Sequence, residues 1–74
     1  MSITEDLADA LARDALEAEA KLNDDRLIEQ LSNVIGAASQ TTQEAFMTAV
    51  RVRRSEAMGR KFLQDKLAKG PQGD

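Results

Sequence analysis

Apolar residues in the N-terminal third of the chain recur every three or four positions. That spacing places them along one side of an α-helix, which has about 3.6 residues per turn. This apolar side consists of Leu7, Leu11, Ala15, Ala18 and Leu22. A capping signature precedes it, because Ser2 is followed three residues later by Glu5, with Thr4 as a competing cap. The pattern predicts a helix over roughly residues 4–22, with this apolar side toward the core.

The apolar pattern changes phase at residues 23–25. Positions that would continue the first apolar side hold charged residues instead. Asn23 or Asp24 is a favourable N-cap for a new helix, and acidic residues suit the positive end of a helix. A second apolar side follows, formed by Leu27, Leu31, Val34, Ile35 and Ala38. We expect a second helix over roughly residues 25–37; a single helix bent at residues 23–25 is the alternative.

A third helix is predicted over roughly residues 42–67, because Thr41 and Glu44 form a second capping box and no proline occurs before Pro71. Its apolar residues change sides along its length when successive residues are placed about 100° apart. Those around Phe46 lie on one side, and the later ones lie on the opposite side. The later set, our candidate oligomer interface, consists of Val52, Met58, Phe62, Leu63 and Leu67.

Two arrangements explain this change of side. In the first, the helix breaks near Arg54–Ser55, and Ser55 caps a new helix. In the second, a straight helix packs on its own bundle with one side and on another subunit with the other. A chain of 74 residues without Cys builds a thin core, which alone rarely supplies more than about 3–5 kcal/mol. We favour the second arrangement because it gives this small core additional burial.

Together these patterns predict an all-α fold, a small helical bundle or helical hairpin of about three helices that is completed by self-association. Residues 1–69 form a single helical domain, and residues 70–74, rich in Gly and polar side chains, form a disordered C-terminal tail. The absence of Cys fits a reducing compartment. The acidic N-terminus lacks the order of a signal peptide, and the apolar runs are too short to span a membrane. We therefore expect a soluble cytoplasmic protein without a membrane partner.

Residue types used in catalysis and metal binding are sparse. The chain has no His and no Cys, which removes the usual zinc ligands, and it has no glycine-rich phosphate loop. Asp24 and Asp25 are a weak candidate for a metal ion, but such acids are common at a helix start. The Ser, Thr and Lys side chains have no visible activating partner. We expect no catalytic, metal or cofactor-binding residues and no enzymatic activity.

Charge divides the chain unevenly. Residues 1–38 carry nine acids and three bases, whereas residues 39–74 carry four acids and seven bases. Four of the bases cluster on one side of the third predicted helix: Arg53, Arg54, Arg60 and Lys61. One interpretation is that they pair with acids of the N-terminal half, and a second is that they contact an acidic protein partner. The third is a nucleic-acid contact, which the pI of 4.8 and the absence of interleaved aromatic residues disfavour.

The function that these observations favour is a small non-enzymatic helical module for protein–protein interaction and oligomerisation, acting as a regulator or adaptor. We expect the chain to form a homo-oligomer. The alternative is a nucleic-acid-associated accessory or regulatory protein that uses the four clustered bases.

Overall fold

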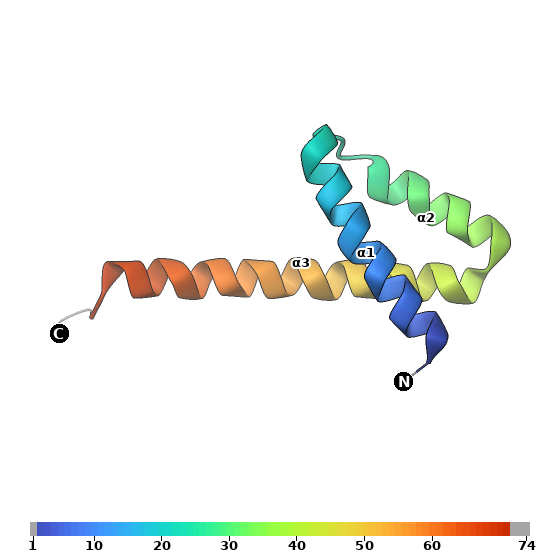
Figure 1. Cartoon of the computed structure of the whole chain (residues 1–74). Helices are drawn as coiled ribbons and strands as arrows, with labels where there is room; N and C mark the ends of the chain where they lie inside the picture. The colour runs from blue at the N-terminus through green and yellow to red at the C-terminus, as the bar shows by residue number, and fades with distance from the viewer. Residues whose placement is uncertain (1, 72–74) are drawn as a thin grey trace.

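The computed structural model describes residues 2–71, which form three α-helices and no strand (Figure 1). They are α1 (Ile3–Leu22), α2 (Leu27–Ala38) and α3 (Gln40–Lys69). Helices α1 and α2 lie against the N-terminal half of α3, and the rest of α3 extends away from them alone (Figure 1). The molecule is therefore elongated, with extents of 56 × 31 × 15 Å. The predicted all-α fold is confirmed.

Helix α1 begins and ends at residues whose conformations suit those roles. Ser2 is its N-cap, and the Ser2 hydroxyl accepts a hydrogen bond from the Glu5 N–H at 3.0 Å. Asn23 closes the helix with φ 51° and ψ 45°, a left-handed conformation that Asn tolerates better than most residues. The N–H groups of Asn23 and Asp24 donate to the carbonyls of the last turn, which is the Schellman pattern. Helices α1 and α2 are thus separate helices, not one bent helix.

The prediction that Asn23 or Asp24 is the N-cap of the second helix was wrong. The Asp24 carboxylate accepts from the Arg26 N–H at 3.0 Å, within the turn. Helix α2 begins at Leu27, and Arg26 occupies its N-cap position without a side-chain capping bond. Short Asn and Asp side chains satisfy nearby backbone groups, so the same residues stabilise either a helix start or a turn.

The predicted cap of the third helix was also displaced. Ser39, not Thr41, is the N-cap of α3, and the Ser39 hydroxyl accepts from the Thr42 N–H at 3.1 Å. Ser39 alone joins α2 to α3, in an extended conformation. From Gln40 the helix continues without a break through Val52–Ser55 to Lys69. The arrangement with a break near Ser55 is therefore wrong, and α3 is one continuous helix.

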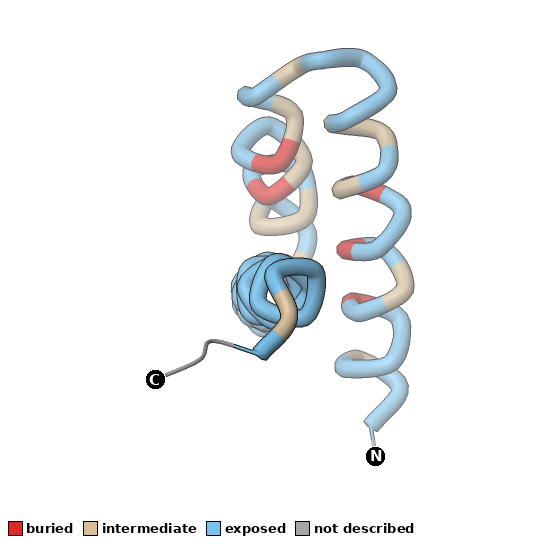
Figure 2. Tube along the Cα trace, turned by 90° about the vertical axis from the view of Figure 1, so that its left-hand side faces the viewer, coloured by how far each residue is buried: buried red, intermediate tan, exposed pale blue. Residues whose placement is uncertain are grey.

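The core lies where α1 and α2 meet the first half of α3. Its buried apolar residues are Ala8, Ala12 and Ala15 from α1, Ile28 from α2, and Phe46 and Val50 from α3. Figure 2 shows the buried positions of α1 on its side toward the other helices. Ala12, Phe46 and Val50 have no exposed surface. Small alanine side chains bring α1 close to α3, where the bulk of Phe46 fills the space between the helices.

The predicted apolar side of α1 was largely wrong. Leu7 and Leu22 are 63% and 66% exposed, and Leu11 is 36% exposed. Of the predicted set only Ala15 is buried, because the alanine side of α1 faces α3. In α2, Val34 and Ala38 are likewise exposed, while Leu27, Leu31 and Ile35 pack partly against the core.

Helix α3 ends at Lys69, and Gly70 follows with φ 75°. Of the predicted C-terminal tail at 70–74, residues 72–74 lie outside the described part of the chain. Each described helix is too short or too polar to cross a bilayer.

Candidate interaction surfaces of α3

The C-terminal half of α3 has no covering from the rest of the molecule. Every residue from 54 to 69 is exposed, and we call this segment the arm. In Figure 2 the arm is seen end-on, and exposed positions surround its axis. Beyond Arg54, its first residue, the arm has only its own hydrogen bonds and neighbouring side chains to keep it helical.

Large apolar side chains gather on one side of the arm, opposite the side that Phe46 uses in the core. We call this set, which includes one residue just before the arm, the arm face: Val52, Met58, Phe62, Leu63 and Leu67. They are between 55% and 74% exposed. The Lys66 ammonium lies 5.8 Å from the centroid of the Phe62 ring, a cation–π distance. All five candidate interface residues thus share one uncovered surface.

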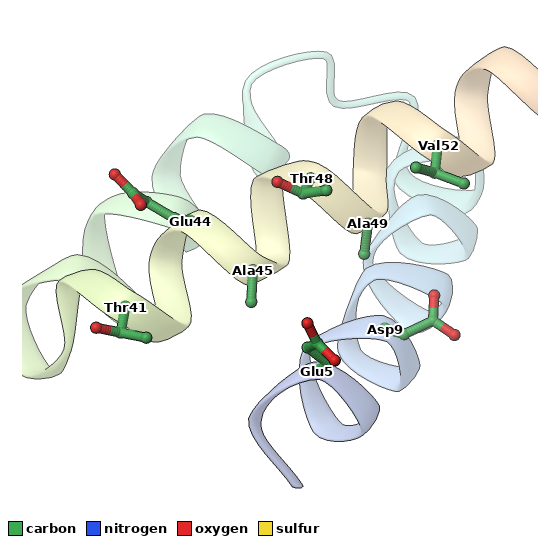
Figure 3. A pocket seen from close by; sticks show the side chains of 8 residues that line it. All are labelled: Glu5, Asp9, Thr41, Glu44, Ala45, Thr48, Ala49 and Val52. Carbon is green, nitrogen blue, oxygen red and sulfur yellow. The ribbon is translucent and has the colours of Figure 1, made fainter. Parts of the chain in front are cut away.

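A groove runs between α1 and the first half of α3, with a volume of about 590 Å³. We call it the α1–α3 groove. Small and short side chains of α3 form its floor, and acidic side chains stand on its rim (Figure 3). The lining residues are Glu5 and Asp9 from α1, and Thr41, Glu44, Ala45, Thr48, Ala49 and Val52 from α3. Val52 belongs to both the groove and the arm face, so the two surfaces are continuous.

The groove is the part of the site that sequence reasoning missed. Thr41, Ala45, Thr48 and Val52 do recur at intervals of four, three and four residues, which is a detectable signal for one helix side. However, small residues on one side of a helix do not by themselves distinguish a groove from ordinary exposed surface. The position at which α1 crosses α3 must be known as well. Only the packing of α1 beside them makes a concave surface.

Two of the four clustered bases join α3 to α1. Arg53 Nε donates to Asp9 Oδ1 at 2.7 Å, and its Nη2 donates to Oδ2 at 3.0 Å. Arg54 Nη2 donates to both carboxylate oxygens of Glu19, at 2.9 and 3.2 Å. Paired contacts between a guanidinium and a carboxylate fix orientation as well as charge. These two arginines therefore hold the crossing of α1 over α3.

The hydrogen bond from Arg53 lowers the pKa of Asp9, with partial burial acting in the opposite direction and the charges of Arg53 and Arg13 adding to the lowering. The same hydrogen bond raises the pKa of Arg53. Both groups remain charged at neutral pH, so the pair is an ion pair under ordinary conditions.

The other two bases pair along the arm itself. Arg60 Nε donates to Glu56 at 2.8 Å, and Lys61 Nζ donates to Asp65 at 3.2 Å. Both are exposed pairs four residues apart on one helix, which stabilise a helix only slightly. The four bases thus lie on one side of α3, but each has a carboxylate partner.

Within residues 2–71, no three carboxylates come together as metal ligands. No family model, curated protein or solved structure matches the chain. An exposed apolar helix side beside a groove suits contact with another helix.

Proposed function

We propose that the protein is a non-enzymatic helical module that self-associates through α3. The observation that carries this proposal is the uncovered arm face. Large apolar side chains confined to one side of a helix mark a contact surface more strongly than scattered ones do. Among residues 2–71, five of the ten large hydrophobic residues that are exposed lie on this face.

The balance of burial supports association. In the described part of the chain, three of the six buried apolar residues are alanines, so few large side chains are buried. Full burial of a Leu, Phe or Met side chain contributes about 1.5–3 kcal/mol. Covering the arm faces of two copies adds a stabilisation comparable with that of the core itself, less the entropy lost on association. It also gives the arm the tertiary packing from which most helix stability comes.

The clustered bases fit a structural role in this proposal. Arg53 and Arg54 bridge to α1, and the pairs of Arg60 and Lys61 stay within the arm. A phosphate backbone would compete with these carboxylates for the same guanidinium and ammonium groups. The net charge of −3 adds a general repulsion toward nucleic acid.

Light scattering across a concentration series tests self-association. We expect the wild-type protein to form an oligomer in the micromolar range and the Leu63→Glu variant to become monomeric, because a carboxylate would be buried at the interface. Ala57→Glu is the matched control, since Ala57 lies on the arm but on the side opposite the arm face, and this variant should associate like wild type. A wild-type protein that stays monomeric throughout, with a cooperative thermal transition, contradicts the proposal.

A further inference from the structure

We propose that two copies of the chain pair antiparallel along α3, with the arm of each copy seated in the α1–α3 groove of the other. This inference rests on the proposed self-association and specifies both the partner and its direction. Four observations lead to it: the continuity of the two surfaces, the sizes of their side chains, Gly59, and the charges at the groove rim.

The groove and the arm face form one strip along a straight helix. Positions 41, 45, 48, 52, 55, 59, 62 and 66 alternate in steps of four and three, which is the heptad spacing of a helix-to-helix seam. The strip begins in the groove at Thr41, passes through Val52, and continues down the arm to Lys66. The larger arm-face side chains of Leu63 and Leu67 flank it. A second helix laid along α3 would contact the whole strip.

The two halves of the strip differ in size. The groove half presents Thr41, Ala45 and Thr48, whereas the arm half presents Phe62 with Met58 and Leu63 beside it. Parallel pairing places large residues against large residues and leaves the groove halves facing each other across a gap. Antiparallel pairing places the large half of each copy over the small half of the other, which approaches the close packing of protein interiors.

The heptad spacing restricts the antiparallel register to steps of seven residues. Reversing the second copy about the point between Arg53 and Arg54 is the register that pairs all eight strip positions with one another. Phe62 of one copy then lies over Ala45 of the other, and Gly59 lies opposite Thr48. Ala45 forms part of the groove floor (Figure 3), so in this register the groove receives Phe62, the largest side chain of the arm.

Gly59 has no evident role in the single chain. Glycine destabilises a helix interior relative to alanine, and apart from the adjoining residues and nearby backbone of its own helix no atom lies within 4 Å of the position that a Cβ would occupy there. In the antiparallel pair, Gly59 lies on the strip opposite Thr48, inside the contact. Its missing side chain allows the two α3 helices to approach closely.

Charges at the two ends of the strip are complementary. Glu5 and Glu44 stand on the groove rim, and Lys66 is the basic residue of the arm strip. Among residues 2–71 none of these three takes part in an ion pair. Antiparallel pairing brings Lys66 over Thr41, within one helical turn of Glu44. Parallel pairing would set Lys66 beside Lys66.

Spin-label distance measurements on single-cysteine variants test the direction of pairing, and the native chain has no Cys to interfere. Ala57→Cys and Gln64→Cys place the label on the arm side away from the strip. At 1.5 Å per residue, antiparallel pairing separates the two labels along the axis by about 10 Å at position 57 and about 30 Å at position 64. Equal distances at the two positions indicate parallel pairing and overturn this inference while leaving self-association intact. If both the labelled and the unlabelled protein are monomeric, self-association and antiparallel pairing are both wrong, because no second copy then occupies the groove.

Charge reversal provides a second readout. Lys66→Glu should weaken the dimer severalfold, because it sets a carboxylate near Glu44 across the contact. The double variant Glu44→Lys, Lys66→Glu should recover most of that loss. If the double variant dimerises no more tightly than Lys66→Glu, residues 44 and 66 do not meet across the contact, which contradicts the register.

Discussion

At the scale of single residues, Asp9 and Arg53 show how charge and packing act together. Asp9 lies on the side of α1 next to its buried alanines, so its carboxylate reaches α3 only when those alanines are in contact with Phe46. The ion pair therefore reports on the correct crossing of the two helices.

The first prediction concerns acid stability. Because the folded-state pKa of Asp9 is lowered, the pair contributes stability above the carboxylate's unfolded pKa, and this contribution is lost as the pH falls through the lower folded pKa. Asp9→Asn should lower the melting temperature at neutral pH and make it fall less steeply below about pH 4. Thermal melts across that pH range check this. Glu17→Gln, on an exposed residue of α1, is the control and should keep the wild-type pH profile.

At the scale of elements, periodicity predicted the helices well and their ends less well. The repeat of apolar residues is local, so the existence of all three helices followed from it. Where a helix begins or ends depends on which of several nearby residues forms the cap. For α3 the cap is Ser39, although Thr41 also had a capping pattern. The buried side of α1 was not predictable from α1 alone, because its leucine side and its alanine side both qualify. The choice depends on how closely α1 must approach Phe46.

The second prediction tests the start of α3. Ser39→Ala removes the hydroxyl that accepts from the Thr42 N–H and should lower the free energy of unfolding by about 0.5–2 kcal/mol. Thr41→Ala is the matched control at the position that the capping-box pattern favoured, and we expect little change there. Urea denaturation of both variants, followed by circular dichroism, measures the difference. A larger loss at Thr41 than at Ser39 would contradict this assignment of the cap.

At the scale of the whole molecule, the chain divides into a packed body and an uncovered arm. The apolar residues of the arm were predicted as an interface from their spacing, and the structure leaves them exposed together. The groove was not predicted, because a concave surface needs two helices whose relative position no local pattern specifies. The acids that pair with Arg53 and Arg54 lie on α1, far from the arginines along the chain, and tertiary packing selects them.

The third prediction compares the two phenylalanines. Phe46 has no exposed surface, and Phe46→Ala should destabilise the fold by about 3–5 kcal/mol, comparable with the whole stability of a core this small. Phe62 is 65% exposed, and Phe62→Ala should weaken association while costing much less helix content than Phe46→Ala. Circular dichroism and light scattering of both variants separate the two effects. Equal loss of helix content in both would place Phe62 in the folding core and contradict the division into body and arm.

The continuity of α3 has a consequence for how opening motions spread along the chain. Because one unbroken helix runs from the core to the tip of the arm, the amide protons of the arm differ from those of the body only in what packs around them. In an isolated chain they open by fraying from Lys69 inward and exchange with solvent long before those near Phe46. In an assembled protein both segments exchange slowly, so the gradient of exchange rates along this single helix reports the fraction of chains that are assembled.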